Sequence, residues 1–213
     1  MLSADFLHLE KDVEMVNSAA DLFHLDIMDG SFVPNISYGF PVVEAIAIKA
    51  VLPLDAHLMI VHPEKYVERF ASAGVEMLSF HYDAVDNPAA VLELVLRHGM
   101  QPGLAINPDI AVEKLFPFIK LCKYIVIMSV FAGFGGQKFI GSTYSRVAAL
   151  KEEICRQGAD CAIEVDGGVS PENSAALAEA GADILVAGSA VFRADDPAAV
   201  IRKIRNSTSS DEK

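Results

Sequence analysis

Short apolar runs alternate with longer amphipathic stretches along the whole chain. Apolar runs of roughly four to eight residues are typical of buried strands, whereas apolar residues spaced three or four apart indicate helices. Strands are therefore predicted at residues 22–28, 54–59, 76–81, 102–106, 124–129, 162–166 and 183–187. Helices are predicted at residues 8–19, 40–50, 63–73, 88–98, 112–120, 142–156, 172–180 and 197–205.

This regular alternation predicts an α/β fold in which helical crossovers join parallel strands. No linker or change of composition divides the chain, so we expect a single (β/α)8 TIM barrel over residues 1–206 and a polar tail over 207–213. Only a stub of the first strand is present, at Met1 to Ala4, so the strand looks truncated at the N-terminus. We expect Met1 to be an internal start that lacks roughly five to eight upstream residues, judged from the usual length of a strand.

Several polar side chains are expected on the inner face of this barrel. Side chains alternate along a strand, so His24 and Asp26 share one face while the apolar residues between them suit the helix-covered face. The same period turns His57 inward from the strand at 54–59. It also turns Glu164 and Asp166 inward from the strand at 162–166. Buried imidazoles and carboxylates are costly unless they are paired or bind a metal. We therefore predict one divalent cation, held by His24, Asp26, His57 and Asp166 at the carboxyl ends of the strands.

Glycine-rich turns follow the last three predicted strands. Glycine lets backbone N–H groups approach a phosphate closely, and the N-terminus of the following helix favours negative charge. Barrel enzymes commonly bind phosphate at this position. The predicted phosphate site consists of Gly133, Phe134, Gly135, Gly136, Gly167, Gly168, Gly188 and Ser189, with His57 as a further substrate contact.

Three methionines lie at the ends of the predicted strands: Met28, Met59 and Met128. Methionine often fills gaps in a core, but at these positions a lining of the reaction centre is equally consistent with the sequence. His81 also ends a strand, and we interpret it as a hydrogen-bonded residue of the barrel wall.

Charge and composition narrow the range of partners. The net charge of −12 makes nucleic acid and anionic membranes unsuitable partners, although a small anion responds to local dipoles instead. Apolar stretches end before the roughly 20 residues that a membrane span needs. The three cysteines have no metal-ligand spacing, and no secretory leader follows Met1, so we expect reduced thiols in a cytoplasmic protein.

The motifs LSADF, HLDIMDGSFVPNISYG, DAHLMI, GFGGQKFI, EVDGGV and AGSAVF occur in this order. From Met1 to about Arg202 the chain closely resembles the ribulose-phosphate 3-epimerase family. The resemblance implies that the metal ligands are those predicted above and that Asp26 and Asp166 also act as the acid/base pair. It further implies that phosphate binds at the glycine turns and that the three methionines cover the reacting carbon.

The reaction implied is inversion of C3 of D-ribulose 5-phosphate to D-xylulose 5-phosphate through an enediolate. A bound cation would stabilise the enediolate charge, and two carboxylates would allow inversion without turning the substrate over. Two His and two Asp suit Zn, Fe(II), Mn or Co, and no organic cofactor is needed. The expected partner is a small-molecule sugar phosphate, and we expect a homo-oligomer.

The sequence departs from the family pattern at two places. The Pro-Ser pair that normally precedes LSAD is missing, and Phe131-Ala132 replaces a polar residue and a proline before GFGG. The altered loop keeps open a 3-epimerase of a ketohexose 6-phosphate such as allulose 6-phosphate. The shortened first strand keeps open a catalytically inactive phosphosugar-binding barrel, although such a protein would not need both Asp26 and Asp166.

Overall fold

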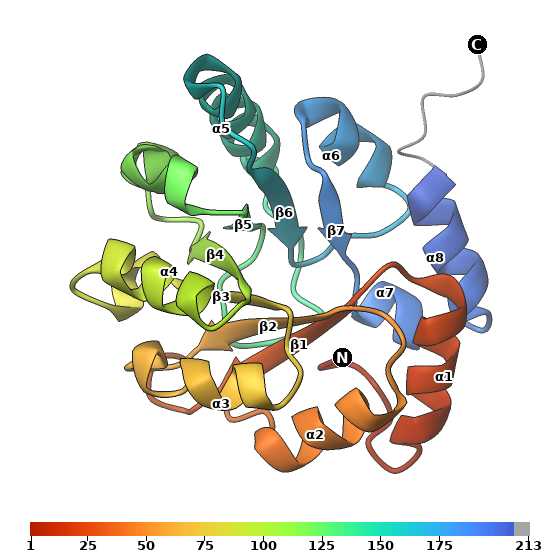
Figure 1. The fold of residues 1–213 in the computed structure, drawn as a ribbon. Helices are drawn as coiled ribbons and strands as arrows, with labels where there is room; N and C mark the ends of the chain where they lie inside the picture. The colour runs from red at the N-terminus through yellow and green to blue at the C-terminus, as the bar shows by residue number, and fades with distance from the viewer. Residues whose placement is uncertain (207–213) are drawn as a thin grey trace.

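The computed structural model describes residues 1–206, which form a curved parallel sheet with helices around its outer side (Figure 1). Each strand pairs in parallel with its neighbours in the sequence, which confirms the predicted alternation. The strands are β1 (Phe23–Met28), β2 (Leu54–Met59), β3 (Met77–His81), β4 (Gln101–Ile106), β5 (Tyr124–Met128), β6 (Ala162–Asp166) and β7 (Ile184–Val186).

The helices follow the strands as expected, with differences at their ends and in their type. They are α1 (Leu9–Ala19), α2 (Phe40–Lys49), α3 (Val67–Ser72), α4 (Pro88–Arg97), α5 (Thr143–Gln157), α6 (Ser174–Ala180), α7 (Ser189–Phe192) and α8 (Pro197–Asn206). Three segments are 3-10 helices: η1 (Pro63–Lys65), η2 (Tyr82–Ala84) and η3 (Val112–Leu121).

Two predicted helices take a different form in the structure. The helix predicted at 63–73 is divided into η1 and α3 at Tyr66. The segment predicted at 112–120 is the 3-10 helix η3, which contains Pro117. Proline has no backbone N–H and its ring clashes with the carbonyl one turn before it, so a regular α-helix is disfavoured there. The short helix α7 was not predicted, because four residues carry no measurable periodicity.

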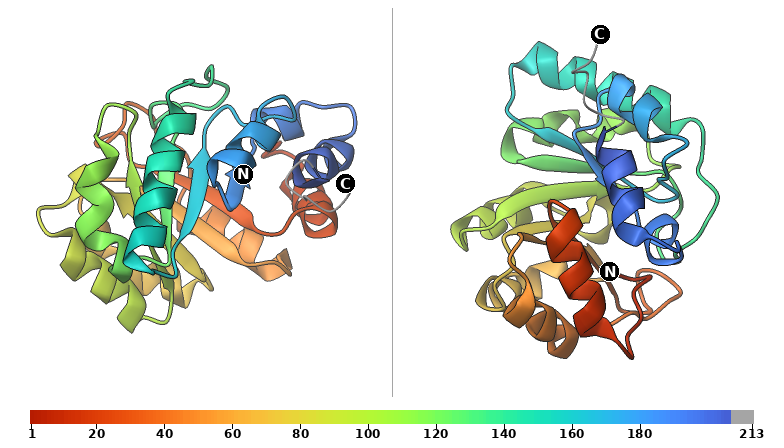
Figure 2. Two further views of the ribbon diagram at one scale, coloured as in Figure 1. Left: turned by 90° about the horizontal axis from the view of Figure 1, so that it is seen from above. Right: turned by 90° about the vertical axis from the view of Figure 1, so that its right-hand side faces the viewer.

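The sheet remains open between β7 and β1. Within residues 1–206 no strand occupies that position, in agreement with the truncated first strand of the predicted barrel. The first residues instead run beside β1, where the buried amino group of Met1 donates to the carbonyl oxygen of His24 at 2.6 Å. Helices α1 and α8 pack against each other next to this opening (Figure 2).

Successive residues of each strand face two different environments, the helix-covered core and the interior of the barrel. Phe23, Leu25 and Ile27 of β1 pack into a continuous apolar core with Val43 and Ile46 of α2. Each large apolar side chain that is fully buried in this way contributes about 1.5–3 kcal/mol. The helix-facing core holds the strands in place, and the intervening residues of the same strands are left to form the interior of the barrel.

Among residues 1–206 we find no helix long and apolar enough to cross a membrane. The predicted polar tail at 207–213 lies outside the described residues.

Candidate active site and metal centre

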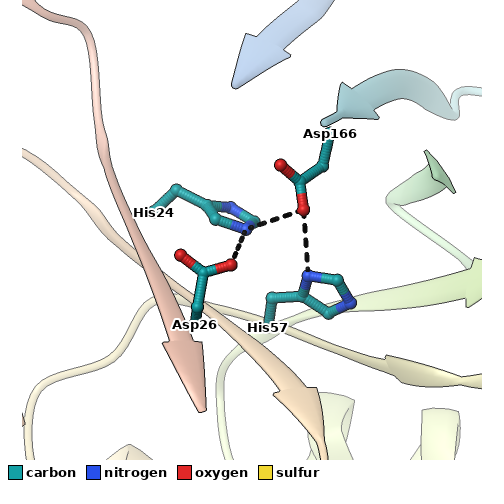
Figure 3. A group of neighbouring side chains, drawn as sticks. All are labelled: His24, Asp26, His57 and Asp166. Atoms are coloured by element: carbon teal, nitrogen blue, oxygen red, sulfur yellow. Dashed lines mark ion pairs between the residues drawn. The ribbon is translucent and has the colours of Figure 1, made fainter. Parts of the chain in front are cut away.

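The four predicted metal ligands meet inside the barrel (Figure 3). His24 and Asp26 come from β1, His57 from β2 and Asp166 from the last position of β6. The parallel register places Asp26 directly beside His57. One possible ligand atom from each of the four residues lies within 4.8 Å of the other three. The site therefore joins the first two strands of the sheet to the sixth.

The ring nitrogens of the histidines point at the carboxylates. His24 Nε2 lies 3.6 Å from Asp26 Oδ1 and 3.9 Å from Asp166 Oδ2, while His57 Nδ1 lies 3.6 Å from Asp166 Oδ2. These distances are too long for hydrogen bonds. They are the separations expected between ligands that share a cation, because each ligand atom would lie about 2.0–2.2 Å from a bound metal.

The same two nitrogens show that a metal ion fits this site. His24 Nε2 and His57 Nδ1 are both buried and have no hydrogen-bond partner among the described residues. A buried polar atom without a partner costs about 1–3 kcal/mol. Two imidazoles and two carboxylates are a donor set that divalent transition metals accept. The residues present therefore fit a divalent cation held by His24, Asp26, His57 and Asp166.

The electrostatics of the site also favour positive charge. Burial opposes protonation of His24, but the nearby carboxylates of Asp55 and Glu164 outweigh it and raise its pKa well above the usual value. Burial likewise works against ionisation of Asp166, but the approach of His57 and the charge of His24 outweigh it and lower its pKa. Burial and the charge of Asp55 raise the pKa of Glu164 to about 8.

A cavity of about 360 Å³ opens above the four ligands. Asp26 and Asp166 line it with side chains that are 11% and 14% exposed, so both carboxylates can reach a molecule inside. The wall also contains the three buried methionines predicted near the reaction centre, Met28, Met59 and Met128. The side chain of His57 is fully buried and does not line the cavity. His57 therefore stays a candidate metal ligand, and the cavity lining gives no support to a direct substrate contact by His57.

The glycine turns lie around the same cavity. All eight residues of the predicted phosphate site line it: Gly133, Phe134, Gly135, Gly136, Gly167, Gly168, Gly188 and Ser189. At Gly168 the backbone is left-handed, and a Cβ would come within 3.0 Å of the backbone nitrogen of Phe139. Glycine at this position thus lets the turn after β6 pack closely against the loop after β5.

The loop after β5 is held by side chains from three other segments. Asn35 donates to the carbonyl oxygen of Gly133 at 2.7 Å, and Asn107 accepts from the backbone nitrogen of Ala132 at 3.0 Å. Arg146 donates to the carbonyl oxygens of Asn107 and Met128, at 2.9 and 3.1 Å. These bonds hold the first part of the loop that carries Phe131 to Gly136, even without the proline that the family pattern has there.

Three residues of the site were not identified from the sequence. Asp55 and Tyr124 lie fully buried beneath His24, and Ser3 lines the cavity next to Gly188. The two-residue period that places His57 inward also places Asp55 inward, so the sequence contained a signal for Asp55. Tyr124 and Ser3 carried no comparable signal, because their positions depend on strands that are distant in the sequence.

The fold and the site together define the class of protein. It is a parallel α/β barrel with a candidate divalent-metal centre and a glycine-lined cavity at the carboxyl ends of its strands, where barrel enzymes place their active sites. The model of the Ribulose-phosphate 3 epimerase family matches residues 1–192. The chain therefore belongs to the ribulose-phosphate 3-epimerase family, as its motifs indicated.

Known relatives agree with this assignment, and solved structures share the fold. The chain is 44% identical over 210 residues to the ribulose-phosphate 3-epimerase of Synechocystis sp., covering 97% of this chain and 91% of the relative. It is 41% identical over 209 residues to that of Bacillus subtilis, covering 97% and 96%. The fold resembles the tryptophan synthase alpha-subunit of Pyrococcus furiosus (TM-score 0.70, 15% identity, 95% and 92% covered) and 3-hexulose-6-phosphate synthase of Salmonella typhimurium (TM-score 0.67, 18% identity, 92% and 90% covered).

Proposed function

We propose that this chain inverts C3 of D-ribulose 5-phosphate to give D-xylulose 5-phosphate, using one divalent metal ion and two aspartates. The observation that carries the proposal is the convergence of two His and two Asp below a cavity whose rim is rich in glycine. The names of the relatives support the choice of substrate.

Asp26 and Asp166 would be the two proton-transfer groups. They come from β1 and β6, which are not adjacent in the sheet, and both side chains reach the cavity. One carboxylate would remove the C3 proton from one side of the sugar, and the other would return a proton from the opposite side. The lowered pKa of Asp166 keeps its carboxylate ionised at neutral pH, as a base requires.

A divalent cation held by the four ligands would stabilise the negative charge that develops on the substrate oxygens. Zn, Fe(II), Mn and Co all suit this donor set, and no organic cofactor is required. The chain contributes the rest of the environment. Met28, Met59 and Met128 form an apolar wall that keeps water from the reacting carbon.

The glycine turns would bind the phosphate group of the substrate. Their backbone N–H groups can approach an anion closely because no side chain intervenes. Binding energy from this remote group supports the chemical step, so free ribulose is expected to be a very poor substrate. Comparable kcat/KM values for the free and the phosphorylated sugar would contradict this assignment.

Turnover is the direct test of the proposed function. The metal-loaded protein is incubated with D-ribulose 5-phosphate, and D-xylulose 5-phosphate is measured with a coupling enzyme, with allulose 6-phosphate tested in parallel. We expect epimerisation of the pentose phosphate that stops on chelation and returns with added metal. Preference for the hexose phosphate would favour the alternative epimerase, and sugar phosphate binding without turnover would favour an inactive barrel.

A further inference from the structure

Each ligand histidine has a second ring nitrogen that points away from the metal centre, and each meets a buried partner there. His24 Nδ1 lies 2.6 Å from Asp55 Oδ2, and His57 Nε2 lies 3.0 Å from His81 Nε2. The side chains of Asp55 and His81 are fully buried and do not line the cavity. Neither residue can therefore contact a substrate bound in the cavity.

We propose that Asp55 and His81 are positioning residues that decide which ring nitrogen of His24 and of His57 is free to bind the metal. This inference rests on the metal centre of the proposed function. It extends that centre by a second layer of residues and assigns opposite tautomers to the two histidines.

Asp55 determines the tautomer of His24. An ionised carboxylate can only accept hydrogen bonds, so the 2.6 Å contact requires the proton of a metal-bound His24 to sit on Nδ1. The lone pair is then on Nε2, the nitrogen that faces Asp26 and Asp166 without a partner. Glu164 Oε1 lies 3.3 Å from the same Nδ1 but makes no hydrogen bond to it. Asp55 is thus the group that orients the ring.

The barrel interior in turn fixes Asp55. The Tyr124 hydroxyl donates to Asp55 Oδ1, so both carboxylate oxygens are engaged. Space for the Tyr124 ring exists because Gly103 lies beside it, where a Cβ would come within 2.5 Å of a ring carbon. Asp55 is therefore held from both sides and cannot rotate away from His24.

His81 gives His57 the opposite tautomer. His57 Nδ1 faces Asp166, so the hydrogen between the two rings belongs to His57 Nε2, which donates to His81 Nε2. Among the described residues, the carboxylate that approaches His81 Nδ1 is that of Asp83, at 4.0 Å. The two metal ligands consequently differ, because His24 has an anionic partner and His57 has an imidazole. A carboxylate partner makes the ligand more basic, so Asp55 is expected to affect metal affinity strongly.

Nitrogen-15 NMR of histidine-labelled, zinc-loaded protein tests the tautomers without any change to the Asp55 pair. We expect His24 to carry its proton on Nδ1 and His57 to carry its proton on Nε2, with the other nitrogen of each ring bound to zinc. The His24 proton should be far downfield and protected from exchange. A proton on Nε2 of His24 would overturn the role of Asp55, and a proton on Nδ1 of His57 would overturn that of His81.

Asp55→Asn keeps the shape of the side chain and removes its charge. We expect the Kd for zinc, measured by competition with a chelator in the absence of substrate, to rise about 10–100-fold, and the downfield His24 signal to move upfield. The matched control is Val126→Ala, which opens space in the same buried apolar cluster as Tyr124 but removes no polar atom. The control should keep the zinc affinity of the wild type even where it lowers the melting temperature.

The outcomes separate this inference from the proposed function. If the wild type binds zinc and Asp55→Asn binds it with the same Kd, the positioning role is contradicted. The proposed epimerase activity is not affected by that result. Equal losses of affinity in Asp55→Asn and Val126→Ala would reduce Asp55 to a packing residue. A wild-type protein that binds no zinc, iron, manganese or cobalt would remove the metal centre and this inference together.

Discussion

The carboxylates and the imidazoles of the site differ in what they can reach. Asp26 and Asp166 line the cavity. His24 also lines it, but its side chain is only 5% exposed, and the fully buried side chain of His57 does not line it. A group that both binds a metal and transfers a proton must touch the substrate, and among the four candidate ligands the two aspartates have the most exposed side chains at the cavity. Their greater exposure therefore favours Asp26 and Asp166 for the proposed proton transfer.

The first prediction at this scale concerns the two aspartates. Asp26→Asn and Asp166→Asn are each expected to reduce the rate of epimerisation by at least ~10², because each removes one proton-transfer group. Rates are compared per metal-loaded site, since the same change also weakens a ligand. In D2O the wild-type product should gain deuterium at C3 and at no other carbon, and each variant should still exchange the proton of one epimer.

Asp109→Asn is a suitable control for these variants, because this exposed aspartate lies just beyond β4 and has no ligand role. It should epimerise at the wild-type rate. If Asp26→Asn or Asp166→Asn retained near-normal epimerisation, that aspartate would have no part in the proton transfer.

At the scale of elements, the glycine turns show that not every glycine has the same task. Gly168 has a left-handed backbone and lies against the backbone of Phe139, so a side chain there would disturb the loop itself. Gly135 has no such restriction, since a Cβ would meet Ser3 and Leu2 only at 3.6 and 3.7 Å. Gly135 is exposed at the cavity, so its lack of a side chain matters chiefly to a ligand.

Gly135→Leu is therefore expected to raise the KM for the sugar phosphate. A loss of about 1.4 kcal/mol of phosphate binding would raise it tenfold. The melting temperature should change little. Gly141→Leu is the matched control, because a Cβ at Gly141 meets no atom within 4 Å and this residue does not line the cavity. Steady-state kinetics on both variants measure the effect. An equal KM in the two variants would argue against phosphate at this turn.

At the scale of the whole molecule, the candidate metal centre brings together strands that are not all neighbours in the sheet. Its ligands come from β1, β2 and β6, and the sheet has a free edge at β1. The unfolded chain has no preformed arrangement of these four side chains, so metal binding favours the folded state. The centre is expected to contribute to stability as well as to chemistry.

Zinc at 100 times its Kd should stabilise the fold by about 2.7 kcal/mol, which corresponds to a rise in melting temperature of roughly 5–10 °C for a chain of this size. Thermal denaturation with and without zinc measures the shift, and the His24→Gln variant serves as the reference. A zinc-induced rise in melting temperature of the same size in His24→Gln would mean that zinc stabilises the protein by binding at another site.

Much of the fold and most of the candidate site could be predicted from the sequence, and the reason is periodicity. The alternation of apolar runs with amphipathic stretches determined the parallel barrel, and the two-residue period turned His24, Asp26, His57 and Asp166 to one side of their strands. Glycine at the turns marked the rim of the cavity. These features depend on local geometry, which each segment carries by itself.

The tertiary structure decided what depends on strands meeting across the barrel. The hydrogen bond from Tyr124 to Asp55 joins residues 69 positions apart, and no local pattern encodes it. The buried position of His57, the different partners of the two ligand histidines and the side chains that hold the loop after β5 likewise depend on how the sheet curves. The sequence by itself therefore determined which residues face inward, and the curvature of the sheet decided which of those residues touch.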